Sequence, residues 1–262
     1  MATRKTSTTK AEGIELSVIE VSHGVLHFRV VGTSPLIQHA MSDKALHDLL
    51  YPQNKKRAAD KQASDKHAPY MEFLGSCYAF RQEDDEPTRL YLPATAFKAA
   101  LINAALDLPG VAKTQLGRLV RVLGDKVPVY GIPQMMMSVV RSADQNKTPD
   151  VRTRAILREW ACAFAVRFVK PLVKEANVAN LLAAAGYLQG VGDWRTQKGS
   201  GNYGEFRLAG ADDADYDRIV AGGGRAAQDA ALLDPSTYDL ETDRLWAWFQ
   251  TEKHRRDGIK AA

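Results

Sequence analysis

The sequence predicts an α+β fold in which helices are mixed with mostly antiparallel strands. Three observations predict it. Short runs with two-residue alternation indicate strands, runs with apolar residues at helical spacing indicate helices, and the two kinds follow one another without regular βαβ alternation. Their order is strand, helix, strands, helix, strands, helix, glycine-rich loop and strand. A doubly wound parallel sheet would require strict alternation, so that class is disfavoured.

The first predicted elements are two strands and a helix. Residues 14–21 and 25–31 have the alternation of strands around a turn at Ser22, His23 and Gly24, a pattern typical of a hairpin. A helix over residues 41–51 follows, with Ser42 as its N-cap.

The next segment is rich in charge. Residues 53–68 indicate a loop or a solvated helix. Residues 72–81 and 89–92 have the composition of strands that flank an acidic turn at residues 83–87.

A helix over about residues 94–106, with Thr95 placed to cap it, precedes three strands. The first two, residues 127–130 and 135–141, are short. The third, residues 159–169, is the clearest because apolar residues alternate strictly at Trp160, Cys162, Phe164, Val166 and Phe168.

The C-terminal part contains two more predicted helices and one strand. The predicted elements are a helix over residues 178–188 capped by Asn177, a glycine-rich segment over 190–204, a strand over 205–208, a flexible break at 222–224 and a helix over 240–254.

The composition is that of a globular protein from a reducing compartment. The chain has 262 residues, of which 45% are apolar and 25% charged. Its two cysteines, Cys77 and Cys162, form no CxxC pair, which excludes a disulfide scaffold, a zinc finger and an iron–sulfur cluster. No apolar run approaches about 18 residues and residues 1–10 lead into none. We therefore expect a cytoplasmic protein without a membrane span.

The chain divides into three predicted parts. Residues 1–13 form a flexible basic arm, residues 14–210 a core with inserts at about 53–70 and 130–158, and residues 211–262 an acidic segment with a C-terminal helix.

Charge is distributed unevenly along the chain. The net charge is +4, but residues 141–207 are strongly basic whereas residues 211–250 are mostly acidic. A basic middle indicates an anionic partner, and nucleic acid is the commonest one.

The glycine-rich segment is one candidate nucleic-acid contact. It combines Gly190, Gly192, Gly199, Gly201 and Gly204 with Trp194, Arg195, Lys198 and Tyr203. Glycines leave amides free for phosphate oxygens, the cations supply charge, and the aromatic rings stack on bases. The alternative is a sharply turning connection with Trp194 buried. A dinucleotide fingerprint is disfavoured because a helix precedes the glycines and a strand follows them. No Gly-Lys pair occurs, which excludes a P-loop.

A basic hairpin is the second candidate. Its cations surround a polar tip, with Met135, Met136 and Met137 at the base, and are Arg141, Lys147, Arg152, Arg154 and Arg158. Such a hairpin could hold a phosphate backbone and wedge between bases. The alternative is an ordinary solvated hairpin. Lys98 lies near the start of a predicted helix, where a positive charge opposes the helix dipole unless an anion is bound beside it. The alternative is an ordinary surface lysine.

No catalytic constellation stands out. The sequence has neither HExxH nor GxSxG, and it indicates no cofactor and no metal. Asp43 and His39 are weak candidates for acid–base work on an RNA backbone.

Three short elements resemble the RAMP superfamily, the RNA-binding proteins that form the backbone of CRISPR effector complexes. They are Gly-Thr-Ser-Pro-Leu-Ile at 32–37, Leu-Pro-Ala-Thr-Ala-Phe-Lys-Ala-Ala-Leu at 92–101 and Gly-Val-Gly-Asp-Trp-Arg at 190–195. The chain is most similar to a stand-alone, phage- or prophage-type branch.

The resemblance implies a ferredoxin-like, RRM-type antiparallel core with inserted lobes and a β-hairpin thumb. It implies that Lys98 and the amides near it hold phosphates, that Arg195 and its glycines line the strand's path, and that residues 141–154 form the thumb. It also implies subunits that stack along one nucleic-acid strand, alone or with other subunits of a ribonucleoprotein complex. Some members cut RNA with an aspartate after the first strand, for which Asp43 is the nearest candidate.

The predicted function is binding of single-stranded nucleic acid, RNA favoured, through its backbone, with assembly into oligomers or a filament. Two alternatives stay open. One is an RNA endonuclease of the same fold, and the other is a phage structural or assembly protein whose basic face is incidental.

Overall fold

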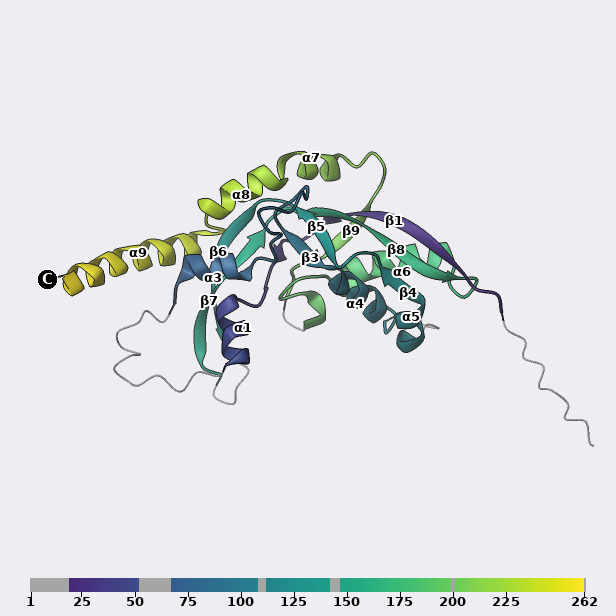
Figure 1. The fold of residues 1–262 in the computed structure, drawn as a ribbon, viewed down its shortest axis with the longest axis horizontal. Coiled ribbons are helices and arrows are strands. Elements are labelled where there is room, and N and C mark those ends of the chain that lie inside the picture. The colour runs from purple at the N-terminus through teal and green to yellow at the C-terminus, as the bar shows by residue number, and fades with distance from the viewer. Residues whose placement is uncertain (1–18, 52–66, 108–111, 142–146, 199–200, 262) are drawn as a thin grey trace, which may run out of the picture.

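The computed structural model describes residues 19–51, 67–107, 112–141, 147–198 and 201–261 (Figure 1). Most of the predicted strand over residues 14–21 and of the insert over 53–70 lies outside these ranges, as does part of the hairpin tip.

A six-stranded antiparallel sheet forms the centre of the molecule. Its order is β3–β5–β8–β1–β9, and β4 also pairs with β8. The two long strands are β1 (Ser22–Gly32) and β8 (Ala161–Lys170). The shorter ones are β3 (Tyr91–Pro93), β4 (Val120–Val122), β5 (Lys126–Tyr130) and β9 (Phe206–Ala209).

The connectivity of this sheet is ferredoxin-like. Between the strands lie α4 (Ala94–Ala104), followed by α5 (Lys113–Leu119), and α6 (Glu175–Leu188). The order β1, α4, β4–β5, β8, α6, β9 is strand, helix, strand, strand, helix, strand, which is the split βαβ pattern. The predicted α+β, ferredoxin-like class is therefore confirmed.

The helices α4 and α6 cover one face of the sheet, as Figure 1 shows. Strand alternation directs Phe164 of β8 and Phe206 of β9 toward α4, where they meet Phe97. The ring centroids of Phe97 and Phe164 lie 4.5 Å apart, and those of Phe97 and Phe206 lie 6.1 Å apart. This aromatic core fixes α4 against the sheet.

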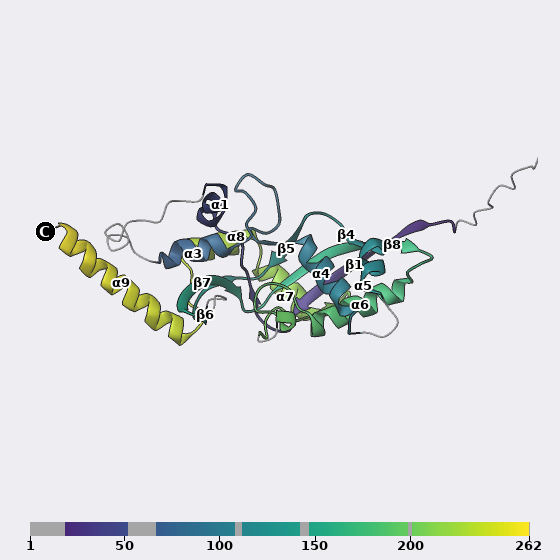
Figure 2. The ribbon, with the colours of Figure 1, turned by 90° about the horizontal axis from the view of Figure 1, so that it is seen from below.

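The predicted hairpin is present as β6 (Pro133–Arg141) and β7 (Pro149–Leu157). It forms a second sheet with β2 (Leu36–Ile37), and α3 (Pro69–Ser76) packs against β7. In Figure 2 this lobe lies at the opposite end of the molecule from α5. The described chain also contains α1 (Asp43–Leu50) and a short 3-10 helix, η1 (Thr196–Lys198).

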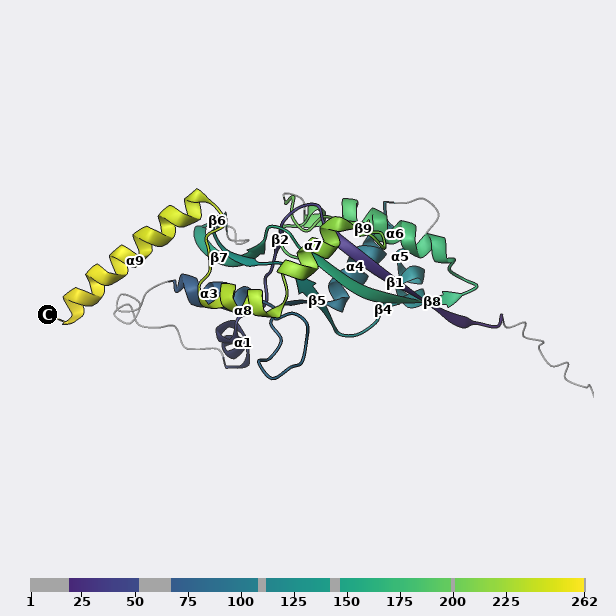
Figure 3. The same ribbon diagram turned by 90° about the horizontal axis from the view of Figure 1, so that it is seen from above.

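The C-terminal segment forms three helices. Figure 3 shows α7 (Ala214–Gly222) lying across the sheet on the face opposite α4 and α6. α8 (Arg225–Leu233) packs beside β6, and α9 (Leu240–Ala261) begins against β6 and then extends away from the body. No helix of the described residues is long and apolar enough to cross a membrane.

Two predicted elements are wrong. Residues 22–24 form the start of a single strand and not a turn, because they pair with the end of β8. Residues 72–81, predicted as a strand, include most of the helix α3. Pro69 at the first helical position favours its start, and burial of Phe73 against the core stabilises it despite its strand-like composition.

The predicted caps also differ. Pro93 and Lys174 occupy the N-cap positions of α4 and α6, and neither makes a side-chain cap hydrogen bond. Thr95 and Asn177 therefore lie inside their helices.

Candidate nucleic-acid interface

Four cationic side chains line one cavity at the edge of the sheet. Lys98 lies on α4, Arg118 near the end of α5, Arg121 in β4 and Arg167 in β8. The cavity has a volume of about 330 Å³, and His23 of β1 lines it beside them. We call the four cations the edge cluster.

The register of the sheet brings two of these charges together. Arg121 and Arg167 are direct cross-strand partners, so their side chains leave the same face of the sheet with Cβ atoms about 5 Å apart. Like charges in this arrangement destabilise a sheet. Among the described residues, the salt bridges join other cations, and no carboxylate lies within 4.0 Å of a member of the edge cluster. A bound anion would remove the repulsion.

Other cations of the central sheet contact groups within the protein. Lys126 lies over two aromatic rings, with centroids at 4.8 and 5.1 Å. Lys170 pairs with Glu175 at 2.6 Å. Arg29 donates to the carbonyl oxygen of Ala211 at 3.0 Å. The edge cluster differs from them because its charges are not neutralised by described neighbours.

A second cavity, of about 500 Å³, continues from the edge cluster toward the start of α4. It is lined by every member of the cluster except Arg118, together with Thr95 and Asp125. The first turn of α4 adds a partial positive charge, because Pro93 supplies no side-chain cap. Positive charge therefore extends along the edge of the sheet, opposed in the cavity wall by Asp125 alone.

The open face of the sheet adjoins this edge. Strand alternation places His23, His27 and Arg29 on the face opposite α4. Across the ladder, His27 faces Ala165 and Arg29 faces Ala163. These small side chains leave a trough of about 540 Å³ beside the cationic and imidazole groups.

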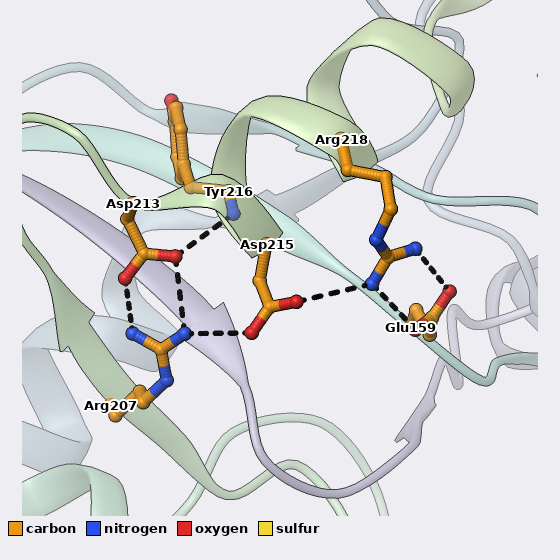
Figure 4. Close-up of polar contacts among 6 residues, drawn as sticks. All are labelled: Glu159, Arg207, Asp213, Asp215, Tyr216 and Arg218. Atoms are coloured by element: carbon orange, nitrogen blue, oxygen red, sulfur yellow. Dashed lines mark hydrogen bonds and ion pairs between the residues drawn. The ribbon is translucent and has the colours of Figure 1, made fainter.

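Ion pairs of the acidic segment hold α7 over the other end of this face of the sheet (Figure 4). Arg207 of β9 pairs with Asp213 and, at 3.1 Å, with Asp215. Arg218 of α7 donates to both carboxylate oxygens of Glu159 at 2.8 Å. The hydrogen bonds from Arg207 lower the pKa of Asp213 to about 2, and Arg218 lowers the pKa of Glu159.

The role of these carboxylates is therefore to hold α7 against the sheet. Within the described ranges no group of three or more His, Cys, Asp or Glu residues is arranged to hold a metal ion.

The hairpin places two predicted cations, Arg152 and Arg154, on one face of β7, and Arg158 directly follows the strand. Arg154 is 7% exposed, pairs with Asp193 at 3.2 Å and lies 5.0 Å from the centroid of the Trp194 ring. Arg158 lies 4.4 Å over the Tyr238 ring. These two guanidinium groups connect the hairpin to the glycine-rich segment and to the chain before α9.

The remaining predicted cations of the hairpin are exposed. Arg152 pairs with Asp150 at 3.4 Å, on the surface of β7. Arg141 and Lys147 lie at the ends of the described hairpin strands, near its tip.

The glycine-rich segment is folded against the core. The amide of Gly190 donates to the carbonyl oxygen of Ala185 at 3.0 Å, and that of Gly204 to Pro35 at 2.8 Å. These two amides are therefore not free for phosphate, contrary to the expectation. Gly190, Gly192 and Gly204 have φ values of 64°, 81° and 74°, in the left-handed region that favours glycine.

The polar and aromatic side chains of this segment contact one another. Arg195 donates to the carbonyl oxygen of Gly192 at 2.9 Å. The rings of Trp194 and Tyr203 lie 6.1 Å apart, and both are half-buried. A Cβ atom at Gly201 would lie 1.5 Å from the Trp194 carbonyl oxygen, so only glycine fits there.

Of the two weak catalytic candidates, His39 is the one whose side chain the structure describes. His39 lines a cavity of about 480 Å³ with Arg154, and partial burial together with that guanidinium lowers its pKa. The side chains of Asp43 and Lys198, and all of Gly199, lie outside the described residues.

Sequence reasoning indicated one member of the edge cluster, Lys98. Arg167 belongs to the basic middle of the chain, but the sequence did not single it out among the cations of that segment. Arg118 and Arg121 lie before that segment and were not indicated. The alternation over residues 159–169 could have found Arg167, because a charge between buried Val166 and Phe168 must face away from the core. The pairing of Arg121 with Arg167 joins distant parts of the chain and has no local signature.

No family model and no curated protein matches the chain. Among solved structures, type III-B Cmr-beta bound to cognate target RNA is similar with a TM-score of 0.37 and 11% identity, over 72% of this chain and 59% of that one. Cmr6 from Pyrococcus furiosus is similar with a TM-score of 0.34 and 8% identity, over 72% of this chain and 98% of that one. Both are RAMP-family proteins, the superfamily that the sequence motifs resemble. Because both TM-scores lie below 0.5, the similarity assigns no activity or partner to this chain.

Proposed function

We propose that this protein binds single-stranded nucleic acid, RNA by preference, through the phosphate backbone. The observation that carries the proposal is the edge cluster, in which four cations line one cavity and no described carboxylate neutralises them. Arginine matches phosphate geometry well, because its planar group donates two parallel hydrogen bonds.

A single strand fits this surface better than a duplex. The cluster continues into a shallow trough on the open face of the sheet, where His27 stands beside small alanine side chains. Unpaired bases can lie on such a face and stack on imidazole rings, whereas the bases of a duplex are already paired and stacked on one another. The exposed hairpin cations Arg141, Lys147 and Arg152 would supply further phosphate contacts.

We further propose that copies of the protein assemble along the strand. The feature that supports this is α9, which extends away from the body (Figure 1). It carries Trp248, whose relative exposure is 64%. Large exposed aromatic side chains are typical of interface centres. A second copy is the partner that a strand occupied by many copies would bring alongside.

Binding of labelled 30-nucleotide RNA, single-stranded DNA and duplex DNA across a salt series tests these proposals. We expect salt-sensitive binding to both single strands, tightest for RNA, and weaker binding to the duplex. Particle size should grow with strand length, and a Trp248→Ser variant should bind short strands normally but form smaller particles. Absence of binding at low salt would refute the function and favour the assembly-protein alternative. Shortening of the RNA during incubation would favour the endonuclease.

A further inference from the structure

The edge cluster holds more positive charge than one internal phosphate requires. Lys98, Arg118, Arg121 and Arg167 are four unit charges around a single cavity of about 330 Å³. An internal phosphodiester carries one negative charge, whereas a phosphate monoester near neutral pH carries about 1.5 to 2. Terminal di- and triphosphates carry more.

The pairing of two arginines across neighbouring strands also favours an anion with more than one negative charge. Arg121 and Arg167 are joined in the regular register of β4 and β8, so their backbones cannot move apart without breaking the ladder. A single negative charge would leave this pair with net positive charge. A group with two charges, or with several oxygens free to accept, can satisfy both guanidinium groups at once.

The size of the cavity agrees with a compact anion. Its volume lies near the lower end of the range of about 300 to 1,000 Å³ in which small ligands bind. The lining comprises the four cations, His23 and apolar residues of α5, β4 and β8, and its phenylalanine, Phe168, is buried in the core. Among these lining residues the His23 imidazole is the one ring exposed to a nucleobase, whereas four cationic side chains surround an anion.

We propose that the edge cluster binds a terminal phosphate of the nucleic-acid strand, a monoester or polyphosphate carrying at least two negative charges. The inference rests on the proposed function, because it assigns the end of the same strand to this site. It predicts that the protein distinguishes phosphorylated from unphosphorylated ends, which a purely internal backbone contact would not do.

The test compares one RNA sequence with four ends: a 5′-hydroxyl, a 5′-monophosphate, a 5′-triphosphate, and a 3′-phosphate on the 5′-hydroxyl strand. Binding is followed by fluorescence anisotropy at constant salt. We expect a terminal phosphate to tighten binding by about tenfold or more, as a charge-assisted contact does. The 5′ and 3′ arms identify which end is held. Inorganic pyrophosphate should compete with the phosphorylated strand.

A pair of variants locates the effect. Arg121→Gln with Arg167→Gln should abolish the difference between phosphorylated and unphosphorylated strands. The matched control, Arg244→Gln with Arg256→Gln, removes the same charge from exposed positions of α9 and should keep it. If all four strands bind the wild-type protein equally and the Arg121/Arg167 variant weakens all of them alike, the cluster holds internal phosphates and this inference is overturned while the proposed function stands. If no strand binds, both fail.

Discussion

The salt dependence of binding should reveal how much phosphate charge the edge cluster neutralises. Each phosphate contact with a single strand contributes about −0.7 to the slope of log affinity against log salt concentration. The four cations at the cavity therefore predict a contribution of about −2.8 if each meets one phosphate charge. Replacing Arg121 and Arg167 by glutamine should reduce it to about −1.4.

These slopes translate into a measurable loss of affinity. Between 50 and 200 mM salt, a slope of about −2.8 lowers affinity roughly 50-fold, and a slope of about −1.4 lowers it roughly 7-fold. Fluorescence anisotropy with a labelled 30-nucleotide RNA at four salt concentrations measures both. Glutamine keeps side-chain hydrogen bonding and removes the charge, so the comparison isolates electrostatics.

Stability distinguishes this effect from unfolding. The two arginines oppose each other across the strands β4 and β8, so their removal relieves repulsion. We expect the double variant to unfold at the same temperature as the wild-type protein or at a higher one. The variant of Arg244 and Arg256 on α9, with the same loss of charge, should retain the wild-type slope. Equal slopes in the Arg121/Arg167 variant and the wild-type protein would refute the assignment of phosphates to this cluster.

Three further predictions concern the scaffold. Asp213 has a pKa of about 2, below its ordinary value, so the stability from its contact with Arg207 is present above about pH 4 and lost as the pH falls toward 2. In urea unfolding at several pH values, the Arg207→Gln variant should lack this loss of stability between about pH 4 and 2. A pH dependence equal to that of the wild-type protein would contradict the assignment. Gln228 is fully buried and hydrogen-bonds five backbone groups, so Gln228→Leu should lower the free energy of unfolding by about 3 kcal/mol or more. A loss of less than about 1 kcal/mol in urea denaturation would contradict this. A Cβ atom on Gly186 would lie 2.0 Å from the carbonyl oxygen of Phe206, so Gly186→Ala should cost about 1–3 kcal/mol by forcing α6 from β9; a melting temperature equal to wild type would show that this contact adapts.

Part of the fold could be predicted because it depends on neighbours in the chain. The alternation from Trp160 to Phe168 predicted the strand β8, and the short strands around residues 127–141 were also correct. Two-residue periodicity assigns alternate side chains to opposite faces, whatever the strand pairs with. The order of these elements was enough to predict the α+β class.

The local sequence pattern did not predict elements whose secondary structure depends on tertiary contacts. Residues 72–76 have the composition of a strand, yet they belong to α3 because Phe73 is buried against the core and Pro69 begins a helix. The short helix α5 and strand β4 had no periodic pattern long enough to identify, although they supply Arg118 and Arg121.

The candidate site divides in the same way. The sequence alone determined that cations are concentrated between residues 141 and 207 and that Lys98 lies near the start of a helix. Which of these charges are neutralised depends on how the chain folds. Arg154 is buried beside Asp193, whereas Arg167 faces Arg121 across two strands. Both outcomes depend on distances between residues far apart in the chain, and side-chain electrostatics depend on those distances and on burial rather than on sequence spacing.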